Sequence, residues 1–493
     1  MKKLMIYFTV LTALLILAGC GAKRSGASVL DAEFFNRKIE GEITVSAYDT
    51  MSYKNYLEEA ARAFEELYPG TKVNIETFSA MPEIRTGEQG GGQMILVQRQ
   101  NDPQSRADYL SRINTNIMSA AGADIYAMDI IPLHKFTESG TLENLVAYMT
   151  LDPRFNKSEY RQNIFDASKY RDGIFFIPMD YTFNYFAYDS TLVPADIAAA
   201  FGAGKAWNTD GLFNIGIPLY NGAYKLFNSF DFSQGPAGGM FNQLLNENVF
   251  YFFNLETGRT NFSDGKFSSL LSSVKNYAEQ GYIPRGITGQ QEAGQLMRIT
   301  AEAVTERFFF KLNGSASLIS QFLRGTGRIM RVEGGQARNI DENDEIAGIQ
   351  SRADGSVPFD YTRGFAINSQ SKNKETAWAF IKFLLSKEMQ LSNTMLNTGI
   401  PVNNEARAEK AELIFSGALY GRAAEMNDQL RHAAENYKAA VEKLSDSINC
   451  FAVQDTIIND MISNEARYFF ADNRTAQETA RILQNRTELY LSE

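Results

Sequence analysis

Hydrophobic side chains occupy every second position in residues 42–48 (EITVSAY), a period of two that predicts a half-buried strand. In residues 57–67 they recur every three or four positions, which predicts a helix, and Pro69-Gly70 ends it. Residues 72–78 (KVNIETF) return to the period of two. A strand, a helix and a strand with short connections form a right-handed βαβ unit, so we expect these two strands to lie parallel in one sheet.

The alternation of elements continues along the chain. We expect a helix over residues 105–121 and a short strand within residues 123–129 (ADIYAMD), so the N-terminal third is α/β. Residues 79–104 hold three successive glycines without the Lys and Ser/Thr of a phosphate-binding loop, and we interpret them as an insertion. From about residue 413 the pattern is helical. In its last helix one core-facing stripe is formed by Ala476, Ala480, Leu483, Thr487 and Tyr490.

The most hydrophobic stretch lies at the N-terminus. Two lysines precede an apolar run over residues 4–17, and small residues follow it, which is the pattern of a secretory signal. The run is shorter than the about 20 apolar residues that a membrane span needs. The sequence LAGC, ending at Cys20, resembles the lipobox of bacterial lipoproteins, in which the signal is removed and the cysteine sulfur is diacylated. The alternative is an uncleaved anchor helix with an incidental cysteine.

The lipobox divides the N-terminus into two parts. We expect residues 1–19 to be a signal peptide and residues 20–40 to be a flexible, Gly/Ser-rich tether with the lipid on Cys20. Two acyl chains suffice for stable anchoring. The expected location is therefore the extracellular or periplasmic face of the cell membrane, to which the lipid would anchor the protein.

Composition narrows the class of protein. The chain has 493 residues and a net charge of −10; without the 19-residue signal it has 474 residues and a charge of −12, because two lysines leave. A single core rarely exceeds about 250–300 residues, so we expect two lobes. The acidity argues against a nucleic-acid partner, which needs a basic face. With Cys20 acylated, Cys450 has no disulfide partner, and we interpret it as a small buried hydrophobe.

One long segment carries a family resemblance. Residues 364–406 (GFAINSQSKNKETAWAFIKFLLSKEMQLSNTMLNTGIPVNNEA) combine a strand, a polar loop, a helix with Trp378 facing the core, and a Gly-Pro turn. This order resembles a signature of extracellular solute-binding proteins, the receptors of ABC importers, of which maltose-binding proteins are familiar members. Residues 123–129, 172–194, 261–284 and 308–319 resemble further family segments and follow in family order.

The resemblance implies an α/β fold with two lobes, a ligand cleft between them and crossing hinge strands. The first crossing is expected at residues 179–184, the second near residues 360–363 and a third in GIPVNN (residues 399–404). The first lobe would then comprise residues 41–181 with 364–400, and the second lobe residues 182–363 with 401–493. A ligand that contacts both lobes would stabilise a closed form.

Cleft-facing ends of strands supply the candidate ligand-binding residues. They are Tyr48 and Asp49 after the first strand, Met128 and Asp129 after ADIYA, Asp180 and Tyr181 at the first crossing, Arg363 at the second, and Trp207 as a platform in the second lobe. Tyrosine rings can stack on the apolar face of a sugar, and carboxylates and Arg can bind its hydroxyls. For each residue, a structural role in a capped turn or at the edge of the core is the alternative.

The function implied is that of a receptor that captures a small solute, most simply an oligosaccharide, and delivers it to an ABC permease. We expect a monomer with no catalytic residues, no metal and no cofactor. A short peptide is the alternative ligand. A lipid-anchored secreted hydrolase acting on carbohydrate is the alternative class, but no nucleophile elbow, zinc motif or cysteine-histidine pair occurs in the sequence. A glycosidase would need a close pair of carboxylates, and the chain has 58 Asp and Glu residues that could supply one.

Overall fold

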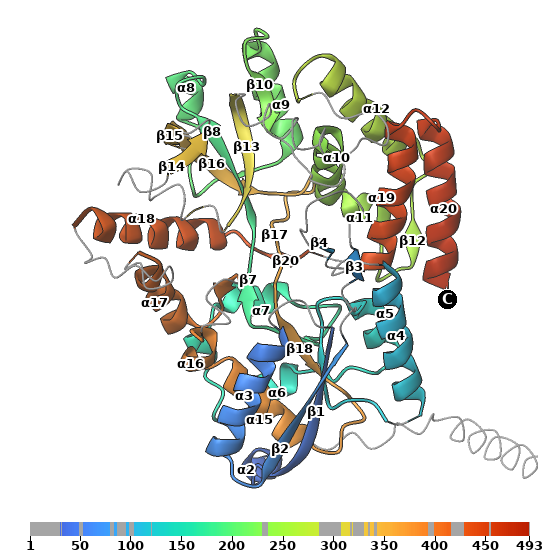
Figure 1. The fold of residues 1–493 in the computed structure, drawn as a ribbon, viewed down its shortest axis with the longest axis vertical. Coiled ribbons are helices and arrows are strands. Elements are labelled where there is room, and N and C mark those ends of the chain that lie inside the picture. Colours follow the sequence, from blue (N-terminus) through green and yellow to red (C-terminus); the bar gives the residue numbers. More distant parts are fainter. Residues whose placement is uncertain are drawn as a thin grey trace, which may run out of the picture.

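A computed structural model describes most of the chain (Figure 1). The described residues are 30, 32–48, 53–78, 83–85, 95–97, 103–119, 121–228, 235–284, 307–315, 318, 330–333, 336–339, 343–392, 399–415, 428–452 and 455–492. The predicted signal peptide, Cys20 and Asp49 lie outside these residues, as does most of the insertion at residues 79–104. Within the described ranges, no helix is both long and apolar enough to cross a membrane.

The first lobe is built on a five-stranded sheet. Its strands, in order across the sheet, are β2 (Thr71–Phe78), β1 (Gly41–Tyr48), β5 (Ile125–Ala127), β18 (Gly364–Ile367) and β6 (Ile177–Pro178). Strand β1 runs parallel to β2 and to β5, as the βαβ pattern predicts, and β18 runs antiparallel to β5. The principal helices around this sheet are α3 (Tyr53–Leu67), α4 (Pro103–Met118) and α15 (Lys374–Leu384). These strands and helices confirm the predicted α/β N-terminal third.

The second lobe has its own five-stranded sheet. Its order is β10 (Lys225–Asn228), β13 (Phe308–Gly314), β8 (Asn184–Asp189), β16 (Asp344–Gln350) and β9 (Ala206–Trp207). Its helices are α8 (Ala195–Ala198), α9 (Thr209–Gly216), α10 (Gly235–Glu247), α11 (Val249–Phe252) and α12 (Lys266–Glu279). The main cluster of buried hydrophobic side chains on the first sheet contains Trp378, that of the second lobe contains Phe310, and a smaller third cluster lies around Tyr48 and Tyr126 of the first sheet. The chain therefore has two main hydrophobic cores, one for each lobe, in accord with its length.

Short strands carry the chain between the two sheets. The chain leaves β6 through β7 (Asp180–Tyr181) into β8, and it returns from β16 through β17 (Pro358–Phe359) into β18. These crossings are held together, because β7 pairs with β19 (Ile400–Pro401) and Thr182 forms a bridge with Asp360. Strand β20 (Cys450–Phe451) pairs with β17 and leads the chain to the C-terminal helices.

The C-terminal end is helical, as the pattern predicts. It contains α17 (Asn404–Phe415), α18 (Asp428–Ser445), α19 (Thr456–Phe470) and α20 (Ala476–Ser492). Helix α19 begins where it does because the Asp455 carboxylate accepts hydrogen bonds from the backbone N–H groups of Ile457 and Ile458. All five residues of the predicted stripe in α20 are buried. Helices α19 and α20 lie beside α10 and α12 of the second lobe (Figure 1).

The remaining elements are short. They are α2 (Ala32–Asn36), β3 (Glu83–Arg85), β4 (Ile95–Val97), α5 (Leu133–Glu138), α6 (Val146–Leu151), η1 (Lys157–Glu159), α7 (Gln162–Ala167), η2 (Ile217–Leu219), β11 (Phe253–Asn254), β12 (Arg259–Thr260), β14 (Met330–Glu333), β15 (Gln336–Asn339) and α16 (Lys387–Gln390). Within the insertion, β3 and β4 pair as an antiparallel ladder. In β20, Cys450 is only partly buried and its sulfur accepts a hydrogen bond from Arg352 (3.2 Å), so it is not the fully buried hydrophobe that its apolar neighbours predict.

Candidate ligand-binding site

A small cavity lies where the first sheet meets the crossing segments. Because β1 and β5 run parallel, their carboxyl ends lie at one edge of the sheet, and the residues that follow β5 open onto this cavity. Its volume is about 60 Å³, and its walls come from four segments of the chain: Met128, Asp129, Ile130, Ile131 and Leu133; Asp360 and Tyr361; Phe451; and Thr456. The cavity therefore joins the edge of the first lobe to a crossing and to the first turn of α19.

Asp129 is the charged group of this cavity. Both carboxylate oxygens are buried, and neither makes a hydrogen bond of ordinary geometry. Burial raises the pKa of Asp129 to about 6, although the nearby Tyr53 hydroxyl and the Arg363 guanidinium oppose part of that rise. A buried carboxylate that lacks well-formed hydrogen bonds is costly, so this group can accept further hydrogen bonds from a polar group that enters the cavity.

Three tyrosines supply further polar groups without partners. The hydroxyl oxygens of Tyr48, Tyr53 and Tyr56 are buried and make no hydrogen bond of ordinary geometry. Burial raises the pKa of Tyr53 and of Tyr56, and for Tyr53 the charge of Asp129 raises it further. Buried hydroxyls are almost always paired, so these three, of which that of Tyr53 lies close to Asp129, are candidates for hydrogen bonds to a polar ligand or water.

Arg363 orients this aromatic group. Its guanidinium carbon lies 4.8 Å from the ring centroid of Tyr56 and 5.3 Å from that of Tyr53, in the range of cation–π contacts. Arg363 follows the second crossing, and its side chain is 3% exposed. Tyr361, which lines the cavity, donates through its hydroxyl to the backbone oxygen of Met128 (3.0 Å) and so fixes the strand end that carries Asp129.

The structure brings some of the predicted site residues together and not others. Met128 and Asp129 line the cavity, Arg363 lies near enough to Asp129 to lower its pKa, and Tyr48 is buried in the same cluster of side chains as Met128. Asp180 is completely buried at the first crossing, where it accepts hydrogen bonds from the backbone N–H (2.7 Å) and the hydroxyl of Thr362. It therefore fixes the two crossings relative to each other.

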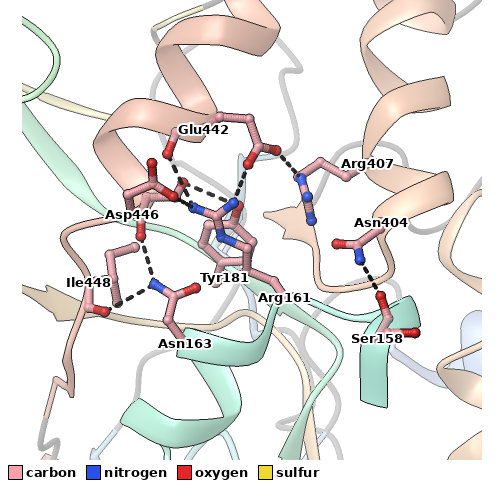
Figure 2. Close-up of polar contacts among 10 residues, drawn as sticks. Ser158, Arg161, Asn163, Tyr181, Asn404, Arg407, Glu442, Asp446 and Ile448 are labelled. Carbon is pink, nitrogen blue, oxygen red and sulfur yellow. Dashed lines mark hydrogen bonds and ion pairs between the residues drawn. The ribbon is translucent and has the colours of Figure 1, made fainter. Parts of the chain in front are cut away.

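The other two predicted residues lie in different surroundings. Tyr181 is buried, and its hydroxyl is 3.2 Å from the Ser445 hydroxyl at the end of α18 (Figure 2). Trp207 is at the edge of the second sheet, half-buried against Phe201, and its indole N–H is buried without a hydrogen-bond partner. Trp207 therefore lies in the second lobe, away from the residues around Asp129, and its role in binding stays a prediction.

Arg161 holds α18 on the hinge side of the crossings. Figure 2 shows its guanidinium between Glu442, with which it also bonds through the backbone oxygen (3.1 Å), and Asp446 (2.7 Å). Arg407 bonds to the same Glu442 carboxylate (2.7 Å). Cations at the C-terminal end of a helix are favourable. The contact of Tyr181 with α18 is thus part of a rigid polar cluster, separate from Asp129 and its neighbours.

Sequence patterns did not reveal Tyr53 and Tyr56 as site residues. They lie three positions apart in the first turns of α3, so they share one face of the helix that follows the first strand. This spacing was a usable signal, because the N-terminus of that helix must lie near the strand end that carries Tyr48.

A second cavity, of about 580 Å³, lies between α10, α11 and α12 of the second lobe. It is less suited to binding, because its buried acid, Glu247, already accepts hydrogen bonds from Thr209 and Gln350.

No group of three or more His, Cys, Asp or Glu side chains in the described part of the chain is arranged to hold a metal ion. The features that remain are two α/β lobes, strands that cross between them and unpaired polar groups at their junction, and these define a two-lobed solute-binding protein. A family model for bacterial extracellular solute-binding proteins matches residues 59–414. The chain belongs to this family, which consists of binding receptors, so the protein is a receptor rather than an enzyme.

Solved structures share this fold. A family 1 extracellular solute-binding protein from Alicyclobacillus acidocaldarius matches 93% of this chain and 100% of its own, with a TM-score of 0.53 and 15% identity. One from Bifidobacterium longum subsp. infantis matches 90% of this chain and 98% of its own (TM-score 0.51, 15% identity). An ABC substrate-binding protein from Listeria monocytogenes, in complex with cycloalternan, matches 92% of this chain and 99% of its own, with a TM-score of 0.50 and 14% identity. These matches confirm the predicted fold class. A search of curated proteins found no sequence match.

Proposed function

We propose that this protein is the lipid-anchored receptor of an ABC importer and that it captures an oligosaccharide between its lobes. The observation that carries the proposal is the cluster of buried, unpaired polar groups at the junction of the lobes: the Asp129 carboxylate and the hydroxyls of Tyr48, Tyr53 and Tyr56. A sugar offers many hydroxyls, each able to donate and to accept. Asp129 would accept from two of them, and the tyrosine hydroxyls would complete the network.

The chemistry of the cluster favours a sugar over a peptide. Aromatic rings next to a single carboxylate suit a neutral polyol, whose C–H faces stack on rings while its hydroxyls bind the acid. A short peptide remains the second candidate ligand. The cycloalternan complex of the Listeria protein, a protein with the same fold, also favours carbohydrate.

Binding would require the lobes to move. The cavity at Asp129 is about 60 Å³, whereas pockets for small molecules are usually about 300–1,000 Å³. The lobes would therefore separate about the crossings to admit the solute and close on it again. Trp207, with its unpaired indole N–H, would supply a contact from the second lobe. A ligand held by both lobes stabilises the closed form by its differential affinity, and the permease would recognise that form.

The domain boundaries and the membrane anchor complete the proposal. We assign residues 41–181 with 364–400 to the first lobe and residues 182–363 with 401–493 to the second. Diacylated Cys20 would hold the mature chain on the outer face of the membrane. A Cys20→Ala variant should leave the membrane fraction in cells that retain the unaltered protein there. An equal membrane fraction for both forms would contradict lipid anchoring.

A ligand screen tests the receptor function. Residues 21–493 would be unfolded thermally with oligosaccharides, monosaccharides, short peptides or buffer alone. A ligand at 100 times its Kd adds about 2.7 kcal/mol, which raises the midpoint visibly. We expect one class of oligosaccharide to raise it and to be recovered unchanged. A shift with peptides alone would favour the second candidate ligand, and conversion of the sugar would contradict the receptor function.

A further inference from the structure

The C-terminal helix pair, α19 and α20, belongs to the second lobe by its apolar side chains. The residues that join the hydrophobic core of that lobe include Ile458, Ile462, Ala466, Phe469, Ala480 and Leu483. Burial of this many apolar side chains is worth far more than a few surface contacts. The helix pair therefore moves with the second lobe whenever the lobes move.

The same helix pair reaches the first lobe mainly through polar contacts. Arg106 in α4 forms an ion pair with Asp460 in α19. Lys135 in α5 donates through Nζ to the backbone oxygen of Tyr490 in α20 (3.1 Å) and lies 3.7 Å from the centre of its ring. The lower ends of α19 and α20 lie next to α4 and α5 in Figure 1. Partly buried Ile457 adds an apolar contact.

These two contacts are less exposed to water than ordinary ion pairs on a protein surface. The Arg106 side chain is 15% exposed and that of Asp460 is 37% exposed, so water screens their attraction only in part. Tyr490 is held in position because its hydroxyl donates to the Asp455 carboxylate (2.9 Å), the same group that caps α19. A positive charge over a fixed, largely buried ring is a favourable cation–π contact.

The contacts lie beside the candidate ligand site. Thr456, the first residue of α19, lines the same cavity as Asp129. Opening the lobes on this side must carry the first turn of α19 away from α4 and α5. The two contacts made by Arg106 and Lys135 therefore exist only when the lobes are close together.

We propose that Arg106 and Lys135 are positioning residues for ligand binding, because their contacts with Asp460 and Tyr490 hold the C-terminal helix pair against the first lobe and so populate the closed arrangement before a solute arrives. The proposal rests on the proposed function in one respect, since it assumes that the closed form binds the ligand. When only a fraction of a protein is competent to bind, the apparent affinity falls by that fraction. Neither residue needs to touch the solute.

A distance measurement tests the proposal without any ligand. Spin labels would be attached through Leu67→Cys in the first lobe and Asn214→Cys in the second, both at exposed positions, with Cys450→Ser to remove the competing thiol. In residues 21–493, which lack Cys20, carrying Arg106→Ala and Lys135→Ala, we expect the distance distribution to widen and shift to longer values. An unchanged distribution would overturn the proposal.

Two further variants separate this effect from damage to the fold. Lys275→Ala removes an ion pair with Asp472 that lies within the second lobe, so it should leave the distances unchanged. Arg106→Asp should lengthen them, and the added change Asp460→Arg should restore them. Failure of the exchanged pair to restore the distances would also overturn the proposal.

Affinity supplies the second readout. For a solute that the ligand screen identifies, loss of both contacts should weaken binding about three- to tenfold, as expected for two modest contacts, and the exchanged pair should recover most of it. Longer distances with unchanged affinity would overturn the positioning role. If no solute binds the unaltered protein but the distances lengthen, the proposed function fails while the contacts retain their effect on the lobes.

Discussion

Replacement of Asp129 by Asn separates the binding role of this residue from a structural one. The change keeps the size of the side chain but removes its charge. Both carboxylate oxygens are buried without a hydrogen bond of ordinary geometry, and burial outweighs the nearby Tyr53 and Arg363, so the charge destabilises the fold. If the carboxylate accepts hydrogen bonds from a solute, the same charge strengthens binding. We therefore expect Asp129→Asn to make the protein more stable and to make it bind more weakly.

The expected gain in stability follows from the pKa of Asp129. Burial raises this pKa from 3.8 to about 6. As the pH rises from about 4, the carboxyl ionises in the unfolded chain before it ionises in the folded one, so stability falls until about pH 6 and stays lower above it. A shift of about two units corresponds to at most about 3 kcal/mol. The variant should gain up to that amount at pH 8 and nothing at pH 4.

The expected loss of affinity follows from the hydrogen bonds that the carboxylate would make. Hydrogen bonds to a charged group contribute about 1.5–3 kcal/mol, so the variant should bind about 10- to 100-fold more weakly at pH 8. In the unaltered protein, affinity should also decline as the pH falls below about 6, because the protonated acid loses its charge. In the variant, affinity should not change over this range.

Urea unfolding at pH 4, 6 and 8 and titration calorimetry with the identified solute measure both effects. The matched control is Glu247→Gln, because burial also raises the pKa of Glu247 to about 7, yet its oxygens are already hydrogen-bonded by Thr209 and Gln350. The control should leave affinity unchanged. An Asp129→Asn variant that is less stable at pH 8 and binds normally would refute the reasoning.

Three further expectations concern single residues. The pKa of Glu247 in the folded protein exceeds its unfolded value of 4.5, so the free energy of unfolding should fall between about pH 4.5 and 7. In Glu247→Gln, urea unfolding should show a smaller change in stability over this pH range, and an unaltered change would contradict this. Arg363→Lys loses the planar contact with the Tyr56 ring and should lower the free energy of unfolding by about 1–2 kcal/mol. An unchanged midpoint of urea unfolding would refute the importance of that contact. Trp378→Phe removes the hydrogen bond that the indole N–H donates to buried Asp152 (2.9 Å), so it should lower the free energy of unfolding by about 1–3 kcal/mol. Calorimetry should show unchanged affinity for the solute, and a loss of affinity would indicate that Trp378 contributes to binding.

Much of the fold was predictable from the sequence. The strand at residues 42–48 alternates because Ile43, Val45 and Ala47 face the main core, although Tyr48 on its other face is also buried in a smaller cluster. The structure pairs this strand in parallel with residues 72–78, as predicted. Trp378 was predicted in the core because Ile381, Leu384 and Leu385 follow it on the same face of the predicted helix, and it is 1% exposed. The short crossing strands carry no periodic signal of their own, and their positions came from the family resemblance.

The site was less predictable than the fold. Met128 and Asp129 were predicted because they follow a buried strand, and strand ends at the edge of a parallel sheet are where ligands gather. The same reasoning also selected Asp180, which the structure shows buried and hydrogen-bonded by Thr362. A sequence cannot tell these two acids apart, because the difference depends on whether a donor from a distant segment reaches the carboxylate.

The most direct test of the central claim is a crystal structure of the protein with the solute that the ligand screen identifies. The account predicts density for an oligosaccharide between the two sheets, with hydroxyls within hydrogen-bond distance of the Asp129 carboxylate and of at least one of the Tyr53 and Tyr56 hydroxyls. Density confined to one lobe, for example in the cavity between α10, α11 and α12, with Asp129 still unpaired, would contradict it.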